Sequence, residues 1–203
     1  HTERLVRLPD GFLCFRPPAE LPAIGPPPRQ ANGHVTFGSF NREFKVSRQI
    51  LDLWCRVILA VPGSRMMMKS IAGSDPATRE HQLGEFERRG VDRSRVQLVG
   101  FIGSQKEHLA MYRDIDIALD TFPYHGTTTT LDALLMGVPV VTLSGYNHAS
   151  RVGASLLGQV GIPEFIARTG DEYVAKAVEL ASDPGRVAAM AAARGVPVWE
   201  LLL

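Results

Sequence analysis

Residues Asp120–Gly137 read DTFPYHGTTTTLDALLMG, and this stretch is the most informative part of the chain. It lies between two short apolar runs, Ile115–Leu119 and Pro139–Leu143, which are typical of buried strands. Its second half, Thr128–Met136, has apolar residues at helical spacing and ends at Gly137, a residue that commonly follows a helix. A strand, a helix and a second strand in this order predict parallel pairing with a right-handed crossover.

The same alternation of short apolar runs and longer helical patterns continues through the rest of the chain. We expect three further strands, at His34–Ser39, Arg65–Ile71 and Val96–Phe101. Six further helices are expected, at Val46–Val61, Pro76–Arg89, Lys106–Arg113, Ala149–Gln159, Asp171–Ser182 and Pro184–Ala193. This pattern predicts an α/β fold: a doubly wound, Rossmann-like parallel sheet with helices on both faces.

The N-terminal part of the chain differs in composition from the rest. Thr2–Phe15 alternates loosely and is expected to form one strand, and the prolines between Pro17 and Pro28 indicate an extended linker. We therefore divide the chain into residues 1–32, a strand with a proline-rich linker, and residues 33–203, the α/β lobe. Because the sequence stops within an apolar segment at Leu203, we expect the lobe to be truncated at its C-terminus.

The overall charge excludes several classes of function. The chain has 22 basic and 21 acidic residues, a net charge of +1, which is unlike a nucleic-acid-binding domain. It also has no apolar run long enough to span a bilayer, so we expect neither nucleic acid nor membrane as a partner. Cys14 and Cys55 give neither metal-ligand spacing nor a disulfide framework, which favours a cytoplasmic protein without a metal.

The threonine run is the strongest indication of a binding site. Thr127, Thr128 and Thr129 are poor helix formers, but at a helix start their hydroxyls cap free amides. Gly126 allows a close backbone approach, and the free amides and dipole of a helix start attract anions. A phosphate fits this combination best. The alternative is that the run only caps a buried helix; its position after a parallel strand favours phosphate.

Three loops are expected at the carboxyl ends of the strands, where ligands bind in such sheets: Phe40–Lys45, Phe101–Gln105 and Asp120–Thr130. Four residues in or next to these loops are candidates for binding, and each could instead have an ordinary structural role. Lys45 can reach a phosphate or be a solvated loop residue. Asp132 can accept hydrogen bonds from ribose or simply favour the helix dipole. His108 can stack on a base or cover a helix surface, and His125 can be a site or a surface residue.

Four segments resemble the O-linked N-acetylglucosamine transferase family, which includes the plant SPINDLY proteins. They are FGSFNREFK (Phe37–Lys45), LDTFPYHGTTTTLD (Leu119–Asp132), MGVPVVT (Met136–Thr142) and ASRVGA (Ala149–Ala154). The resemblance runs from about Phe37 to about Ser182 with the segments in the expected order. It implies the C-terminal catalytic lobe of a two-lobe GT-B glycosyltransferase.

The resemblance also implies a reaction and its participants. The donor would be a UDP-sugar, most often UDP-N-acetylglucosamine (UDP-GlcNAc), and the acceptor a Ser or Thr hydroxyl of a protein, with inversion at the anomeric carbon. No metal or other cofactor is implied. The missing partners would be an N-terminal catalytic lobe and tetratricopeptide repeats, and the base would come from that lobe, so this chain alone is expected to be inactive.

The resemblance implies a role for each of these candidates except His125. Lys45 would be catalytic, stabilising the leaving diphosphate together with Gly126, Thr127, Thr128 and Thr129. Asp132 would hold the ribose. The Phe101–Gln105 loop, which contains Gly103, and His108 would frame the uracil, while Arg42 would lie at the donor, where some members carry Gln.

The sequence departs from the family pattern at a few of these positions, and other functions stay open. His125-Gly126-Thr127 stands where the family usually has Asn, then Gly or Ala, then His or Gly, and Gln105 stands where a lysine is usual. UDP-sugars and GDP-sugars are therefore both open as donors. The alternatives to an N-acetylglucosamine transferase are another GT-B transferase or an epimerase-like lobe, and a non-catalytic interaction domain.

Overall fold

The computed structural model describes residues 4, 6, 12–69 and 74–192. Within them the strands form one six-stranded sheet in the order β3-β2-β1-β4-β5-β6, and every neighbouring pair is parallel. The strands are β1 (Thr36–Ser39), β2 (Arg65–Lys69), β3 (Val96–Val99), β4 (Ile117–Leu119), β5 (Val140–Leu143) and β6 (Ile166–Ala167). The predicted α/β fold is confirmed. The sequence analysis missed β6 because two residues are too few to show a period.

Apart from a four-residue helix at the end of the predicted linker, the helices of the described residues follow the predicted alternation. They are α1 (Arg29–Asn32), α2 (Arg48–Ala60), α3 (Pro76–Glu87), α4 (Gln105–Ala110), α5 (Thr128–Leu135), α6 (Val152–Gln159), α7 (Gly170–Ser182) and α8 (Pro184–Ala192). Two predicted helices are interrupted. The range Lys106–Arg113 continues after α4 as a 3-10 helix, Met111–Asp114, and a 3-10 turn at His148–Ser150 precedes α6.

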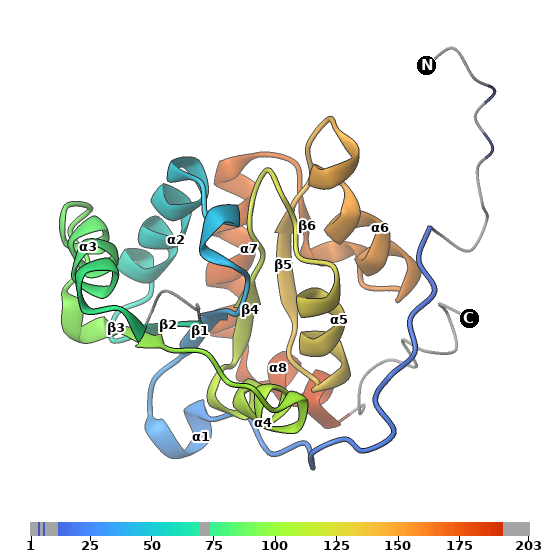
Figure 1. The fold of residues 1–203 in the computed structure, drawn as a ribbon, viewed down its shortest axis with the longest axis horizontal. Coiled ribbons are helices and arrows are strands. Elements are labelled where there is room, and N and C mark those ends of the chain that lie inside the picture. Colours follow the sequence, from blue (N-terminus) through green and yellow to red (C-terminus); the bar gives the residue numbers. More distant parts are fainter. Residues whose placement is uncertain (1–3, 5, 7–11, 70–73, 193–203) are drawn as a thin grey trace.

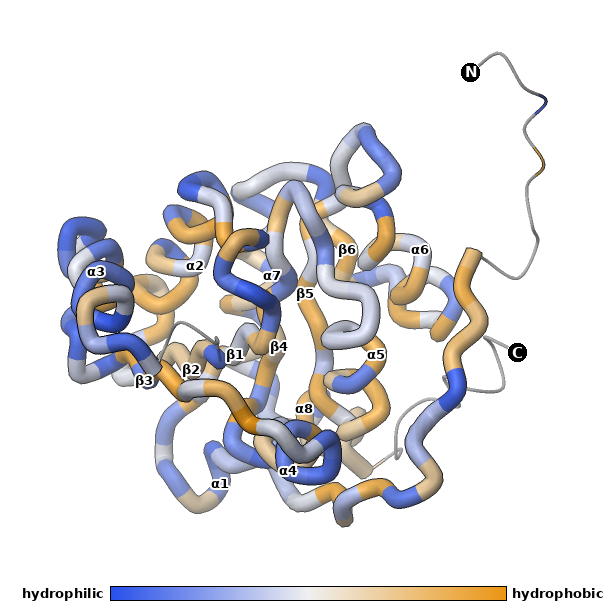
Figure 2. Tube along the Cα trace, in the orientation of Figure 1, coloured by the Kyte–Doolittle hydropathy of each residue, from blue (hydrophilic) through white to orange (hydrophobic). Residues whose placement is uncertain are grey.

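Helices cover both faces of the sheet (Figure 1). Helix α2 connects β1 to β2 and α5 connects β4 to β5, so the chain crosses the sheet in opposite directions from its centre. Right-handed crossovers then place α2 and α5 on opposite faces. Helix α7 packs against α2. Figure 2 shows hydrophobic residues along β4 and β5 and mostly hydrophilic ones along the outer helix α3, as expected for a buried centre and a solvated rim.

The N-terminal segment differs from its prediction. Phe12–Phe15 form no strand, and most of the rest of the predicted strand Thr2–Phe15 lies outside the described residues. The proline-rich stretch is attached to the lobe. The Arg29 amide donates to Asp116 Oδ1 over 3.0 Å, and the Arg29 guanidinium donates to the Ala181 carbonyl over 2.7 Å. The expected linker therefore packs against the domain, because these two part-buried hydrogen bonds fix its end.

The described part of the chain contains no helix that is both long and apolar enough to cross a bilayer.

The feature that matters for function is the centre of the sheet. Strand order reverses between β1 and β4, so the loops after these strands diverge and leave room at their carboxyl ends. Gly137 ends α5 with φ of 74°, a left-handed conformation that favours glycine, and returns the chain to β5.

Candidate functional site

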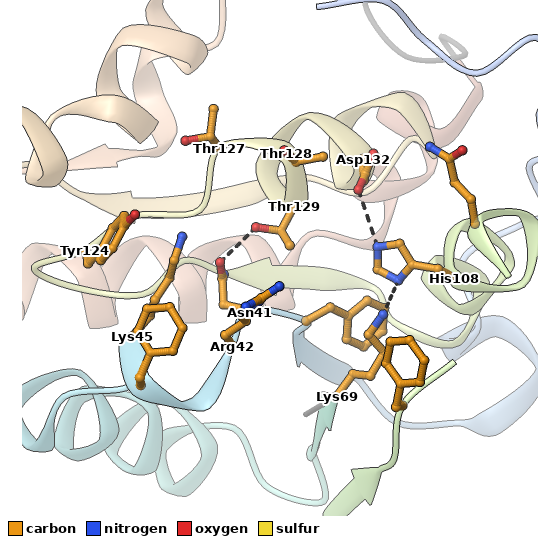
Figure 3. A pocket seen from close by; sticks show the side chains of 14 residues that line it. Asn41, Arg42, Lys45, Lys69, His108, Tyr124, Thr127, Thr128, Thr129 and Asp132 are labelled. Carbon is orange, nitrogen blue, oxygen red and sulfur yellow. Dashed lines mark hydrogen bonds and ion pairs between the residues drawn. The ribbon is translucent and has the colours of Figure 1, made fainter. Parts of the chain in front are cut away.

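A cavity of about 650 Å³ lies at the carboxyl ends of the central strands, where the strand order reverses (Figure 3). Its walls come from the loop after β1, the end of β2, the segment from β3 into α4, and the loop from β4 into α5. The lining residues are Phe40, Asn41, Arg42, Phe44, Lys45, Lys69, Phe101, Gln105, His108, Tyr124, Thr127, Thr128, Thr129 and Asp132. The three loops predicted to meet at this edge therefore do meet.

The first turn of α5 presents free backbone amides to this cavity. Thr127, the N-cap residue, makes no side-chain cap. Two hydroxyls of the run are engaged elsewhere: Thr129 Oγ1 donates to Asn41 Oδ1 over 2.8 Å, and Thr130 Oγ1 to the Gly126 carbonyl over 3.0 Å. Within the described residues, no protein acceptor contacts the amides of Thr127, Thr128 and Thr129. The expected capping by hydroxyls is therefore wrong, and these amides remain available to an anion.

Lys45 reaches the same end of the cavity from a 3-10 helix, Glu43–Lys45. Its ammonium donates to the His125 carbonyl over 2.9 Å and lies 4.1 Å from the centre of the Tyr124 ring. Burial lowers the pKa of Lys45; the carboxylate of Asp120 opposes this shift, and nearby Arg42 adds to it. Two cationic side chains therefore face the free amides of α5, an arrangement that favours a multiply charged anion.

A fully buried polar cluster around Asp120 supports the turn that precedes α5. Asp120 Oδ1 accepts from the amides of Gly126 and Thr121 at 2.8 and 2.9 Å, and Asp120 Oδ2 accepts from Thr142 Oγ1 at 2.8 Å. Burial raises the pKa of Asp120. The amide of Gly126 is therefore occupied, and Gly126 does not line the cavity. The free amides therefore begin at Thr127, one residue later than expected.

His125 belongs to the same buried cluster and is not a surface residue. Its side chain is completely buried. Its Nδ1 accepts from the Gly153 amide at 3.0 Å, so its Nε2 carries the proton and donates to the Leu143 carbonyl at 2.9 Å. Both ring nitrogens are satisfied within the protein. His125 holds the turn in place and has no free group to offer a ligand.

The other end of the cavity combines a carboxylate with aromatic rings. Asp132 lines it from α5, and Asp132 Oδ2 lies 3.4 Å from His108 Nε2. His108 packs beside Phe40 and Tyr112, with ring centres 6.1 and 5.6 Å away. Lys69, at the end of β2, lies 2.6 Å from His108 Nδ1. Flat rings beside a carboxylate with remaining acceptor capacity suit a nucleoside, whose base stacks and whose sugar donates hydrogen bonds.

The structure brings most of the predicted site residues together. Arg42, Lys45, His108, Thr127, Thr128, Thr129 and Asp132 all line the cavity, whereas Gly103 is exposed and does not. Sequence reasoning missed Asn41, Lys69 and Tyr124. Asn41 and Tyr124 were inside the segments quoted for the resemblance, so their position could have identified them. Lys69 was taken as part of a strand, and only its place at the strand's carboxyl end hinted at a site.

Within the described residues, no group of three or more His, Cys, Asp or Glu side chains is arranged to hold a metal ion. The cavity thus has the free amides with Lys45 and Arg42 at one end, and Asp132 with aromatic rings and Lys69 at the other (Figure 3).

Comparison with known proteins places this geometry in a family. The sequence model of glycosyl transferase family 41 matches residues 28–200. The chain is 47% identical over 183 residues to a probable UDP-N-acetylglucosamine–peptide N-acetylglucosaminyltransferase SPINDLY of Petunia hybrida, covering 90% of this chain and 20% of that protein. It is 33% identical over 159 residues to the UDP-N-acetylglucosamine–peptide N-acetylglucosaminyltransferase of Caenorhabditis elegans, covering 78% and 13%.

Solved structures agree. An O-GlcNAc transferase mutant from Thermobaculum terrenum superposes with a TM-score of 0.90 at 39% identity, covering 100% of this chain and 38% of that one. The C-terminal domain of a glycosyl transferase group 1 family protein from Francisella tularensis shares the fold, with a TM-score of 0.60 at 15% identity, covering 89% of this chain and 94% of that one. The chain thus has the fold of one GT-B lobe. It spans about a fifth of the length of the SPINDLY relatives it matches. From the match over residues 28–200, the chain belongs to glycosyl transferase family 41.

Proposed function

We propose that this chain is the UDP-sugar-binding lobe of a protein O-glycosyltransferase. The whole enzyme would transfer N-acetylglucosamine from UDP-GlcNAc to Ser or Thr hydroxyls of proteins, with inversion. One observation carries the proposal: a single cavity has two cations and free amides at one end and an open carboxylate beside aromatic rings at the other. These ends suit the diphosphate and the nucleoside of one ligand.

The chemistry assigned to this lobe is stabilisation of the leaving group. As the bond from the anomeric carbon to the diphosphate breaks, negative charge grows on the departing UDP. Lys45 and Thr127, Thr128 and Thr129, whose amides have no protein acceptor, line the cavity, and pre-organised donors of this kind lower the barrier. No metal is needed in this scheme because protein groups neutralise the charge.

Other groups in the cavity would bind the donor without taking part in bond breaking. Asp132 would accept hydrogen bonds from the ribose hydroxyls, and His108 and Phe101 would contact the base. Arg42 would supply a second positive charge near the phosphates. The base that deprotonates the acceptor hydroxyl is assigned to an N-terminal lobe, which we expect together with tetratricopeptide repeats in the whole protein. We therefore expect this chain to bind UDP and to transfer no sugar on its own.

Calorimetric titration of the chain with UDP and with UMP tests the proposal. UDP should bind about tenfold more tightly or better, because its second phosphate adds charge-assisted hydrogen bonds. Lys176→Ala is the control and should leave both affinities unchanged, since Lys176 Nζ donates to the Glu164 carbonyl away from the cavity. Equal affinities for UDP and UMP would overturn the diphosphate assignment. If neither nucleotide binds or changes the melting temperature, the non-catalytic interaction domain is the better description.

We also infer a cytoplasmic location for the whole protein. Support comes from the cysteines: Cys14 is exposed, Cys55 is buried, and both are free thiols. Burial raises the pKa of Cys55 to about 12, so this thiol stays protonated and inert at neutral pH. Imaging of the tagged full-length protein in its native cell tests the inference, and a signal confined to an oxidising compartment would contradict it.

A further inference from the structure

Three side chains at the nucleoside end of the cavity form a continuous polar chain (Figure 3). Lys69 Nζ, at the end of β2, lies 2.6 Å from His108 Nδ1, and His108 Nε2, on α4, lies 3.4 Å from Asp132 Oδ2 on α5. The three elements come from separate parts of the sequence. All three residues line the cavity, yet leaving-group stabilisation makes no use of Lys69.

Hydrogen-bond capacity determines how the chain is arranged. A lysine ammonium donates and cannot accept, so His108 Nδ1 must present its lone pair to Lys69. A neutral imidazole has one N–H, which then lies on Nε2 and points to Asp132. Removal of the ammonium would free the imidazole to place its proton on Nδ1. The Asp132 carboxylate would then face a ring nitrogen lone pair.

The ring has little freedom to respond in any other way. His108 packs beside Phe40 and Tyr112, and its side chain is 16% exposed. The Asp132 side chain is 7% exposed, and its nearest polar partner on this side is the His108 ring. A carboxylate held in this way keeps one oxygen against the histidine and leaves acceptor capacity toward the cavity. Two adjacent hydroxyls are the natural ligand for such an oriented carboxylate.

We propose that Lys69 is a positioning residue that sets the Nε2–H tautomer of His108, so that His108 orients the Asp132 carboxylate for the two ribose hydroxyls of the donor. The inference rests on the proposed function for the identity of the ligand. The tautomer itself is a property of the ligand-free chain.

The first test measures the tautomer without any nucleotide. Long-range ¹H–¹⁵N spectra of the chain distinguish protonated from unprotonated ring nitrogens, and His108→Gln identifies the His108 signals. We expect wild type to show Nε2–H, Lys69→Met to show a mixture of tautomers, and Lys69→Arg to restore Nε2–H because guanidinium only donates. The control Lys176→Met should leave the signals unchanged. An unchanged Nε2–H tautomer in Lys69→Met would overturn the proposal.

The second test measures the coupling of Lys69 to the ribose hydroxyls. Wild type and Lys69→Met are titrated with UDP and with 2′,3′-dideoxy-UDP. We expect Lys69→Met to weaken UDP about tenfold and to leave dideoxy-UDP within about twofold, with Lys69→Arg recovering most of the loss. An equal loss for both ligands means that Lys69 acts on the base or the phosphates, which overturns the positioning role.

Failure of the proposed function gives a different result. Wild type would then bind neither nucleotide, and the ribose role would fall with it, while the tautomer spectra would still report on Lys69 and His108. Melting temperatures of all variants, measured alongside, show that each one is folded.

Discussion

The carboxylates of two Asp–His pairs, Asp120 and Asp132, lie in the loop and helix that follow β4, but their hydrogen-bond partners differ. In the buried pair, Asp120 Oδ2 is 3.6 Å from His125 Nδ1; in the cavity pair, Asp132 Oδ2 is 3.4 Å from His108 Nε2. Both carboxylates are almost inaccessible, with residues 2% and 5% exposed. Burial and distance therefore do not distinguish the two pairs.

Hydrogen-bond accounting does distinguish them. Asp120 accepts from two backbone amides and a hydroxyl, and His125 has a partner on each ring nitrogen. Asp132 has the His108 ring beside one oxygen, and the rest of its capacity faces the cavity. A satisfied buried group stabilises the fold, whereas a buried group with spare capacity indicates a ligand. Asp120 and His125 therefore form a structural pair, and Asp132 and His108 form the pair that we propose binds the donor.

The largest expected effect is on the structural side. Asp120→Ala leaves the amides of Gly126 and Thr121 and the Thr142 hydroxyl without an acceptor, so the free energy of unfolding should fall by about 3 kcal/mol or more. The melting temperature should then drop by roughly 10 °C in calorimetry. Asp132→Ala is the matched variant and should melt within a few degrees of wild type while losing UDP affinity. Similar destabilisation by both substitutions would break the comparison.

On the binding side, Lys45→Ala in the full-length enzyme should reduce turnover by roughly a hundred- to thousandfold, because a pre-organised donor to the leaving diphosphate is lost. The melting temperature should change little, since Lys45 contributes one hydrogen bond, to the His125 carbonyl. Steady-state assays of sugar transfer measure the effect, with Lys176→Ala as the control. Near-normal turnover would remove Lys45 from the catalytic role.

The charge of Lys45 also predicts that UDP affinity depends on pH. This effect should be no larger than that of removing the whole side chain in Lys45→Ala. Burial lowers the pKa of Lys45, so the ammonium loses its proton at a lower pH than a free lysine does. The diphosphate binds the protonated form. UDP affinity should therefore be full below the Lys45 pKa and decline as pH rises through it. Calorimetry across alkaline pH should show this decline in wild type and a smaller one in Lys45→Ala, where Lys69, whose pKa burial also lowers, still loses its charge.

A smaller effect tests whether the buried turn at Gly126 and the cavity residue Thr129 depend on each other. A Cβ at Gly126 would collide with Thr129 Oγ1 and lie 2.8 Å from Asn41 Oδ1. Gly126→Ala should cost about 1–3 kcal/mol of stability and weaken UDP binding, because Thr129 must move. Gly158→Ala on α6 has open space around the new Cβ and should be neutral or slightly stabilising. Thermal melting with and without UDP measures both. A neutral Gly126→Ala would mean that the turn tolerates displacement.

The smallest effect concerns Tyr112, which lies beside His108 and donates from its hydroxyl to the Thr129 carbonyl over 3.0 Å. Burial raises the pKa of Tyr112 well above its usual value, so the hydroxyl stays protonated as a donor. Tyr112→Phe should cost about 0.5–1.5 kcal/mol in denaturant unfolding, and Tyr146→Phe, at a fully exposed position, nothing measurable. A larger loss at Tyr112 would show that this hydrogen bond supports the first turn of α5.

Much of this protein follows from local sequence. Alternating apolar runs and helical periods predicted five of the six strands and the parallel sheet, because side-chain period and crossover handedness are local properties. The threonine run predicted a helix start at the strand ends, and Lys45, His108 and Asp132 were predicted at the cavity that they line. Each of these predictions needs only the helix, strand or loop in which a residue lies and the strand end that precedes it.

Only the tertiary structure decided which polar groups are already satisfied. From the sequence, His125 could be a site or a surface residue, and Gly126 was predicted to bind the ligand. The fold gives the Gly126 amide to Asp120 and closes both His125 nitrogens with Leu143 and Gly153. It also brings Lys69 to His108 across 39 residues. Hydrogen-bond partners of this kind come from distant segments, so the spare capacity that marks a binding site exists only once the chain has folded.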